Sequence, residues 1–176
     1  APGAGLSLGR ARFETANDSV QEELRGVLRS GGVGDVLKYL NARTPHRYTG
    51  LYRFDGAVLR NVALFDREQP QSRRGEDSPL RETYCSIVGE TQAAVVITDA
   101  NADPRAANNP GRSSVLSYCG ALVRATDGTP IGTLCSFDPA PQPVRDDDIA
   151  LLEATAWLLG NEVTRDAIDA SLLKTL

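Results

Sequence analysis

The stretch SYCGALVRATDGTPIGTLCSFD, residues 117–138, decides the fold class. Two apolar-rich segments flank Asp127-Gly128, and Asp-Gly is a strong signal for a two-residue β-hairpin turn. We therefore expect two antiparallel strands here. Each strand carries one cysteine near its middle, Cys119 or Cys135. The stretch thus raises the question of whether these thiols form a redox or metal site or pack as small side chains in a sheet.

A second hairpin is predicted upstream of the first. The segments HRYTGLYRF and AVLRNVALF, residues 46–54 and 57–65, are typical of strands and are joined by Asp55-Gly56. The apolar run AAVVITDA, residues 93–100, indicates a further short, buried strand. Because strands joined by hairpins are antiparallel, the chain is predicted to be α+β rather than a doubly wound nucleotide-binding fold.

Two helices are predicted before the first hairpin. Ser19 and Glu22 have the S-x-x-E spacing of a capping box, which indicates a helix start. Gly31 and Gly32 are expected to end this helix, since glycine favours helix C-termini. A second short helix then presents apolar residues on one face over residues 33–40.

Two more helices and a long connection complete the chain. Ser78 and Pro79 have the pattern of an N-cap and a first helical residue, and Gly89 suits the other end of that helix. Residues 145–176 predict one long helix with an acidic first turn. Residues 101–114 contain two prolines and three asparagines, which is typical of a long connection that covers a site.

Size, charge and cysteine content limit the classes of protein and partner. The 176 residues are most simply one domain, and a net charge of −4 gives no basic footprint for nucleic acid or an anionic membrane. No stretch approaches the ~18 apolar residues that span a bilayer, and the first ten residues do not resemble a secretory signal. Three cysteines are an odd, sparse number, so we expect a cytoplasmic location.

Several motifs occur in an order that resembles a known family. They are SYCG at residues 117–120, Asp-Gly at 127–128, and GTLC at 132–135 followed by Asp138. These motifs are similar to the S-Y-x-G-x-P-L, D-G and G-T-L-C-x-x-D signature of the GAF domain, a small-molecule sensory module related to PAS domains. DSPLRETYCSIV, VVITDANADPR and the closing helix extend the resemblance over roughly residues 18–165.

The resemblance implies an architecture and domain boundaries. A central antiparallel sheet of five or six strands would carry the terminal helices on one face. Short helices and the long connection would lie over a pocket on the other face. The expected divisions are a flexible N-terminal arm over residues 1–14, a GAF-like sensory domain over 15–165 and a C-terminal helical extension over 166–176. The chain is either complete or part of a longer signalling protein.

The expected pocket binds a small molecule non-covalently. Ligand sites are mostly apolar with a few placed polar groups. The candidate ligand-binding residues are Tyr52, Tyr84, Cys85, Thr98, Asp99, Ser117 and Cys119. The helix expected to begin at Pro79 offers the positive end of its dipole to an anionic group. The alternative for the two tyrosines is core packing, and for Asp99 it is a turn or helix cap.

No metal or cofactor is expected. Structural zinc sites need closely spaced ligands, whereas Cys85, Cys119 and Cys135 are separated by 34 and 16 residues and His46 is the single histidine. By resemblance, a bilin would attach through a cysteine beside a histidine, and no such pair occurs. We therefore expect Cys135 to be a small apolar side chain in the sheet.

Catalysis is the first alternative to binding. One branch of the GAF family reduces free methionine sulfoxide and has its key cysteine in the loop before the signature strand. Residues 101–114 contain no cysteine, so the resemblance favours a module that is not an enzyme. A thiol-based redox sensor, or a reductase-like enzyme that uses Cys85 and Cys119, remains the alternative.

The last helix predicts a homodimer. Apolar residues recur every three or four positions from Leu152 to Leu173, and the part after Gly160 continues beyond the expected domain edge. That part can pair with the same helix of a second subunit. We expect signalling through the terminal helices or the dimer to a downstream signalling domain or protein. A structural dimerisation domain without a ligand is the second alternative.

Overall fold

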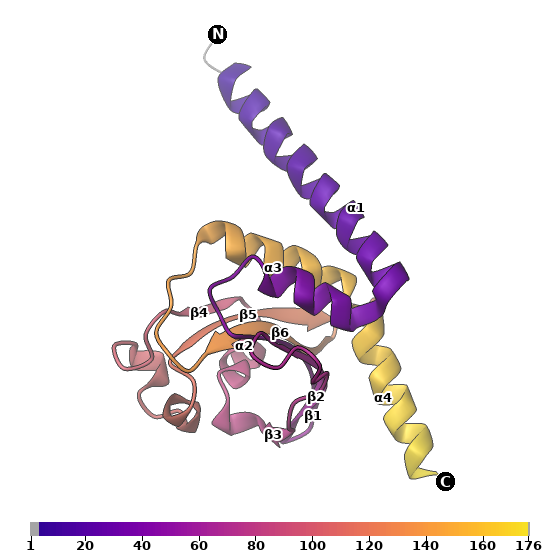
Figure 1. Ribbon diagram of the computed structural model, residues 1–176, viewed down its shortest axis with the longest axis vertical. Helices are drawn as coiled ribbons and strands as arrows, with labels where there is room; N and C mark the ends of the chain where they lie inside the picture. Colours follow the sequence, from indigo (N-terminus) through magenta and orange to yellow (C-terminus); the bar gives the residue numbers. More distant parts are fainter. Residues whose placement is uncertain (1–3, 176) are drawn as a thin grey trace.

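The protein is built on one six-stranded antiparallel sheet, in the order β3-β2-β1-β6-β5-β4. The computed structural model describes the backbone of residues 4–175 and the side chains of residues 18–175 (Figure 1). The strands are β1 (Tyr48–Asp55), β2 (Val58–Asp66), β3 (Ser78–Pro79), β4 (Val95–Ile97), β5 (Ser117–Arg124) and β6 (Pro130–Asp138). The predicted α+β class and antiparallel sheet are confirmed.

Both predicted hairpins are present. Asp55 pairs with Val58 at the end of the first hairpin, and Gly56 in its turn has a φ of 57°. Gly128 in the turn of the second hairpin has a φ of 89°. L-residues with a Cβ rarely adopt this left-handed region, so glycine is strongly favoured in both turns. The central contact of the sheet joins the hairpins through β1 and β6.

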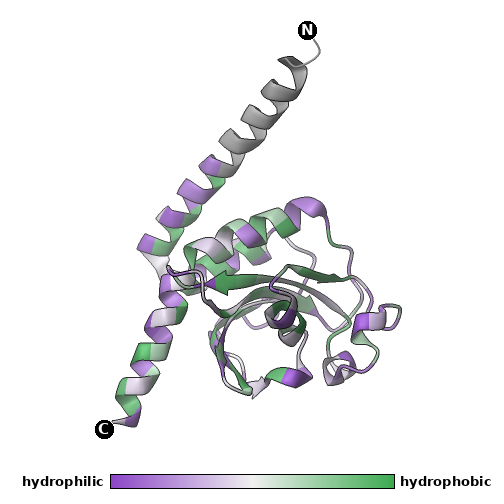
Figure 2. Ribbon diagram, turned by 180° about the vertical axis from the view of Figure 1, so that it is seen from behind, coloured by the Kyte–Doolittle hydropathy of each residue, from purple (hydrophilic) through white to green (hydrophobic). Residues whose placement is uncertain are grey.

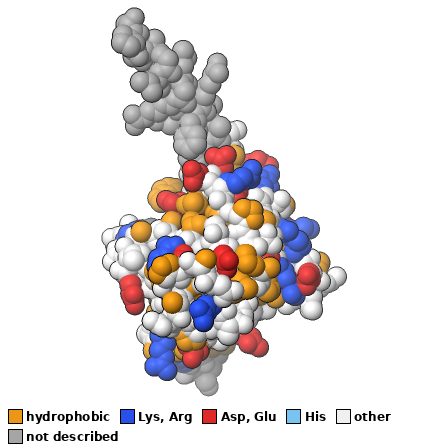
Figure 3. All heavy atoms as spheres, turned by 90° about the vertical axis from the view of Figure 1, so that its left-hand side faces the viewer, with side chains coloured by type: hydrophobic (Ala, Val, Ile, Leu, Met, Phe, Trp, Pro, Cys, Tyr) orange, Lys and Arg blue, Asp and Glu red, His pale blue; other side chains and the backbone are white. Residues whose placement is uncertain are grey.

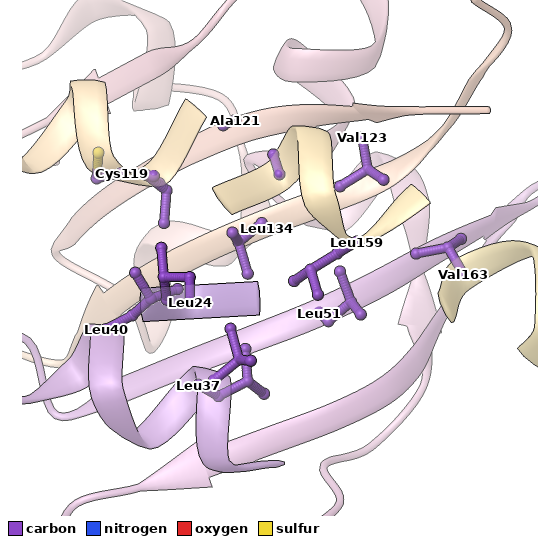
Figure 4. Packing of buried hydrophobic residues seen from close by; sticks show 13 residues of the cluster. Leu24, Leu37, Leu40, Leu51, Cys119, Ala121, Val123, Leu134, Leu159 and Val163 are labelled. Atoms are coloured by element: carbon purple, nitrogen blue, oxygen red, sulfur yellow. The ribbon is translucent and has the colours of Figure 1, made fainter. Parts of the chain in front are cut away.

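One face of the sheet is covered by helices from both ends of the chain, as expected. These are α1 (Ala4–Asn41) and α3 (Asp146–Leu158) (Figure 1). They enclose a core of buried side chains between helices and sheet (Figure 4). We call this the helix-face core; it consists of Leu24, Val36, Leu37, Leu40, Leu51, Cys119, Ala121, Val123, Leu134, Leu152, Ala156, Leu159 and Val163.

The beginning of α1 differs from the prediction. The helix runs from Ala4 through Ser19 and Glu22, so their S-x-x-E pattern does not mark a helix start. The predicted break is present at Gly32, where φ is 75° and ψ is −169°. Residues 4–14 of the predicted arm have helical backbone, whereas residues 1–3 lie outside the described part of the chain.

The predicted helix cap at Ser78 and Pro79 is wrong. These residues form β3 and pair with Leu59 and Val58 at the edge of the sheet. Proline is tolerated there because an edge strand does not need every N–H for the ladder. The helix α2 (Cys85–Thr91) begins six residues after Pro79 and follows the 3₁₀ helix η1 (Leu80–Glu82).

The predicted single C-terminal helix is interrupted. It is divided at Leu159 into α3 and α4 (Gly160–Lys174), and α4 extends away from the sheet (Figure 1). A Cβ on Gly160 would lie 2.4 Å from the carbonyl oxygen of Arg124. The break therefore accommodates close contact with the end of β5. Within residues 4–175, no helix has the length and apolar character that crossing a bilayer would need.

Candidate functional site

A cleft of ≈ 420 Å³ lies on the face of the sheet opposite α1 and α3. The sheet forms its floor, and η1, the start of α2 and the 3₁₀ helix η3 (Pro110–Ser113) form its walls. It is lined by Tyr52, Leu59, Ser78, Glu82, Thr83, Tyr84, Cys85, Pro110, Gly111, Ser113, Ser114, Val115, Tyr118, Cys135 and Phe137. The expected pocket position, under short helices and the connection 101–114, matches this cleft.

Aromatic side chains dominate the floor of the cleft. Side chains alternate along a strand, so Tyr118 faces the cleft while its neighbour Cys119 faces the helices. The ring of Tyr84 packs against that of Tyr118 edge to face, with 5.5 Å between the ring centroids. The Tyr84 hydroxyl donates to the carbonyl oxygen of Val115 at 2.8 Å. This hydrogen bond joins the two walls of the cleft.

A buried group of thiols and hydroxyls lies at the bottom of the cleft. The Cys85 sulfur accepts a hydrogen bond from the Thr133 hydroxyl at 3.1 Å and is 3.2 Å from the Tyr118 hydroxyl. Cys135 lies beside Cys85, and both side chains line the cleft. We call these four residues the thiol–hydroxyl cluster.

The cluster separates the acidities of the two thiols. Burial favours the neutral form of Cys85, but hydrogen bonding with Cys135, Thr133 and Tyr118 outweighs burial, and the net pKa of Cys85 is lowered. Burial and the neighbouring Cys85 raise the pKa of Cys135 well above its usual value. Burial also raises the pKa of Tyr118, which keeps its hydroxyl protonated. The cluster therefore favours negative charge on Cys85.

Three of the seven predicted site residues line the cleft. Tyr52, Tyr84 and Cys85 come together there from β1 and from the segment that begins α2. Ser117 and Cys119 lie on the opposite face of the sheet. The Ser117 hydroxyl donates to the carbonyl oxygen of Ala140 at 2.8 Å, and Cys119 belongs to the helix-face core.

The other two predicted residues lie in the turn after β4. Thr98 is exposed, and its carbonyl oxygen accepts a hydrogen bond from the Gln142 N–H at 3.1 Å. The Asp99 carboxylate accepts from the N–H of Asn101 at 3.0 Å, which is the turn-cap geometry considered from the sequence. Neither residue lines the cleft.

Sequence reasoning missed much of the floor. Tyr118, Cys135 and Phe137 line it, and Thr133 supports it from β6. The period of two along the strand 117–124 placed Tyr118 opposite Cys119, so this alternation was the available signal. The predicted anion site at the start of a helix at Pro79 has no counterpart, because Pro79 is followed by the three-residue 3₁₀ helix η1, and α2 begins only at Cys85.

The predicted redox partners Cys85 and Cys119 do not form a pair. Cys85 faces the cleft and Cys119 faces the helices, so the sheet separates them. Burial, together with Asp148 and Glu153, raises the pKa of Cys119 to about 12. All three cysteines lie in the described part of the chain and are free thiols. Among the described residues, no group of His, Cys, Asp or Glu side chains has the arrangement of a metal site.

Two wider grooves lie elsewhere on the surface. One of ≈ 880 Å³ passes between the end of the first hairpin and α2, beside Phe54 and Arg81. The other, of ≈ 770 Å³, lies near Trp157 and Arg124. We assign the candidate site to the smaller cleft because it contains the buried thiol–hydroxyl cluster.

Comparison with known proteins identifies the family. The GAF domain model matches residues 15–163. The chain belongs to the GAF domain family. A cyclic di-GMP phosphodiesterase of Pseudomonas aeruginosa is 31% identical over 86 residues, which is 47% of this chain and 15% of that protein. The chain thus spans only a small part of that relative's length.

Solved structures share the GAF fold at low sequence identity. The GAF domain of an Acinetobacter phosphoenolpyruvate-protein phosphotransferase is 16% identical, with a TM-score of 0.67 over 85% of this chain and 93% of that one. The free methionine-R-sulfoxide reductase of Neisseria meningitidis, solved with its substrate, is 18% identical, with a TM-score of 0.64 over 86% and 91%. The fold therefore occurs both in an enzyme and in a domain of a phosphotransferase.

Proposed function

We propose that this GAF domain is a sensory module that binds a small molecule non-covalently in the cleft. The observation that carries the proposal is a hollow of ≈ 420 Å³ with an aromatic floor and a hydroxyl-rich rim. Small-molecule sites are typically concave, mostly apolar and supplied with a few polar groups. The volume lies within the range of about 300–1,000 Å³ that such sites occupy.

The lining favours a ligand with a flat, apolar body and polar groups at one end. Tyr52, Tyr118 and Phe137 provide ring surfaces on the floor, against which a flat molecule can stack. Ser113 and Ser114 lie at the rim with exposed side chains, and Glu82 adds a carboxylate. These groups suit a ligand whose polar end carries hydrogen-bond donors.

A role in binding rather than catalysis is the simpler assignment. The connection 101–114, in which the methionine sulfoxide reductase branch is expected to carry its key cysteine, contains none. The three free thiols agree with a reducing compartment, so we assign the domain to the cytoplasm. On the face shown in Figure 3, acidic and basic side chains are interspersed, which gives no support to a nucleic acid or membrane partner.

The terminal helices are the proposed route of signalling and dimerisation. Along β5 and β6, successive side chains point alternately to the cleft and to the helix-face core, so these two strands contact both regions. Hydrophobic segments continue along α4 beyond the sheet (Figure 2). Its exposed side chains Ile168, Leu172 and Leu173 are 55%, 59% and 71% exposed. A second copy that packs on them forms a homodimer, and a downstream domain or protein reads its arrangement.

Native mass spectrometry of the purified chain tests ligand binding. The wild type is expected to carry a co-purified molecule, or to gain one from a metabolite mixture, and to release it on unfolding. Ser114→Trp places a large ring at the rim and is expected to abolish the adduct. Gln71→Trp, in an exposed loop away from the cleft, is the matched control and is expected to keep it. If both variants carry the adduct to the same extent, the ligand binds outside the cleft. If the wild type carries no adduct, a purely structural domain is favoured.

A further inference from the structure

The thiol–hydroxyl cluster brings two free cysteines from different elements to the bottom of an accessible cleft, where a small movement of their side chains is needed to bring the sulfurs to disulfide distance. Cys85 is the first residue of α2, and Cys135 lies in β6. Their side chains are 3% and 1% exposed, yet both contribute to the cleft surface. A small solute that enters the cleft can therefore reach them, whereas Cys119 has no such access.

The surroundings of the Cys85 sulfur are those of a hydrogen-bond acceptor. The Thr133 hydroxyl donates to it at 3.1 Å, and the Tyr118 hydroxyl lies 3.2 Å away. Tyr118 belongs to β5 and Thr133 to β6, so two strands fix the donors beside the sulfur. Donors held in a buried site stabilise a thiolate, which is the nucleophilic form of cysteine.

We propose that Cys85 and Cys135 form a peroxide-reactive pair that closes a disulfide at the bottom of the cleft. Cys85 is the nucleophile, Cys135 is the resolving thiol, and a hydroperoxide is the oxidant. Thr133 is a positioning residue that acts through Cys85. The pair requires the cleft as an entrance but does not require the proposed ligand.

The atoms and electrons balance in two steps. The Cys85 thiolate attacks one peroxide oxygen, the O–O bond breaks, and the departing oxygen takes a proton to leave as water or an alcohol. Cys85 is then a sulfenic acid. The Cys135 sulfur attacks the Cys85 sulfur, the S–O bond breaks, and the thiol proton leaves with the hydroxyl as water. The peroxide is reduced by two electrons, and the two thiols become one disulfide.

The disulfide would change the cleft. It ties the start of α2 to the middle of β6, and it removes the acceptor to which Thr133 donates. Oxidation is therefore expected to alter the shape of the site in which the ligand is proposed to bind. The domain would then respond to hydroperoxide as well as to its ligand.

Peptide mapping of the peroxide-treated wild type is the direct test. After treatment with hydrogen peroxide and blocking of free thiols in denaturant, the chain is expected to carry one blocking group, on Cys119, where the reduced chain carries three, and to lack two hydrogens at Cys85 and Cys135. Digestion should give a Cys85–Cys135 cross-linked peptide that dithiothreitol reverses. A cross-link that includes Cys119, or thiols that remain free at peroxide concentrations that oxidise glutathione, would overturn the proposal. This test uses no ligand, so it is independent of the binding assay.

Variants distinguish the nucleophilic role of Cys85 from the resolving role of Cys135, and they test Thr133 as the positioning residue. Cys135→Ala is expected to stop at a dimedone-reactive Cys85 sulfenic acid, whereas Cys119→Ala should form the disulfide like the wild type. Thr133→Val should slow alkylation of Cys85 by iodoacetamide about tenfold at neutral pH and shift its pH profile upward, because a thiolate donor is lost. Thr133→Ser keeps the hydroxyl and should restore the wild-type profile. An identical profile in Thr133→Val would contradict the positioning role.

Discussion

At the scale of single residues, the chain's single histidine, His46, is buried without a polar partner for its ring. It is 1% exposed, and neither ring nitrogen has a hydrogen-bond partner. Burial lowers its pKa from the ordinary value of 6.5, and this outweighs the opposite effects of Asp138 and Asp148. The folded state thus favours the neutral ring. The resulting stability is fully present above the unfolded pKa and is lost as pH falls below about 6.5 toward the folded pKa.

His46→Leu is expected to reduce this pH dependence. Leucine has a similar size and no buried nitrogen to satisfy, so the free energy of unfolding at pH 7 should rise by ~1 kcal/mol. The decrease in stability of the wild type between pH 7 and pH 5 should be smaller in the variant. Urea unfolding followed by circular dichroism at both pH values measures the change. The same decrease in both proteins would show that other groups cause it.

The residues of the site were only partly predictable. Tyr52, Tyr84 and Cys85 were identified because hairpin and helix patterns placed them near a pocket that the GAF resemblance implied. Ser117 and Cys119 were assigned to the pocket face of the sheet. Strand alternation shows that these two residues and Tyr118 lie on opposite faces, but it does not show which of the two faces packs against the helices. That choice depends on where α1 and α3 pack, which is tertiary information.

At the scale of elements, Gly160 determines where the C-terminal helix is interrupted. A Cβ at this position would lie 2.4 Å from the Arg124 carbonyl oxygen and 3.5 Å from its carbonyl carbon, and a backbone carbonyl cannot move aside as a flexible side chain can. Since α3 and β5 pack against each other, the contact holds α3 close to the end of β5.

Gly160→Ala is therefore expected to destabilise the fold by ~2 kcal/mol, because the added methyl overpacks the contact. Gly26→Ala is the matched control, since nothing lies within 4 Å of its added Cβ and it is inside α1. Alanine there should stabilise the helix by roughly 0.5–1 kcal/mol. Thermal unfolding compares the two variants. If Gly160→Ala unfolds at the same temperature as the wild type, the break between α3 and α4 can move to accommodate the added methyl group, which contradicts this account.

Elements with local signals were predicted better than those set by tertiary contacts. The two hairpins follow from Asp-Gly turns, and the break at Gly32 follows from a local glycine pair. By contrast, Ser78 and Pro79 look like a helix cap but pair with β2, and α3 and α4 look continuous but separate at Gly160. In both cases the deciding contact is with a distant strand.

At the scale of the whole molecule, the sheet separates a solvent-accessible cleft from a helix layer that continues into α4. Trp157 on α3 is 73% exposed, and apolar side chains of α4 are also uncovered. Exposed apolar patches of this kind mark interaction surfaces in soluble proteins. The proposed dimer would cover the α4 patch and connect the helix layers of the two copies.

Substitution of the α4 patch tests dimerisation. Ile168 and Leu172 are four residues apart and lie on one side of the helix. The double variant Ile168→Asp and Leu172→Asp should sediment as a monomer at concentrations at which the wild type is a dimer. Lys174→Asp changes the charge at an exposed position on the other side of the same helix and should remain dimeric. A wild type that is monomeric in sedimentation velocity would contradict the proposed dimer.

The most direct test of ligand recognition in the cleft is an NMR titration of the ¹⁵N-labelled domain with the metabolite that most raises its Tm. The largest amide shift changes should occur at Tyr84, Cys85 and Val115, with little change at Leu37 and Val163 in the helix-face core. The assignment of this face as the ligand-binding site is contradicted if the amide shift changes are concentrated in the helix layer. It is also contradicted if no compound shifts the amides that line the cleft.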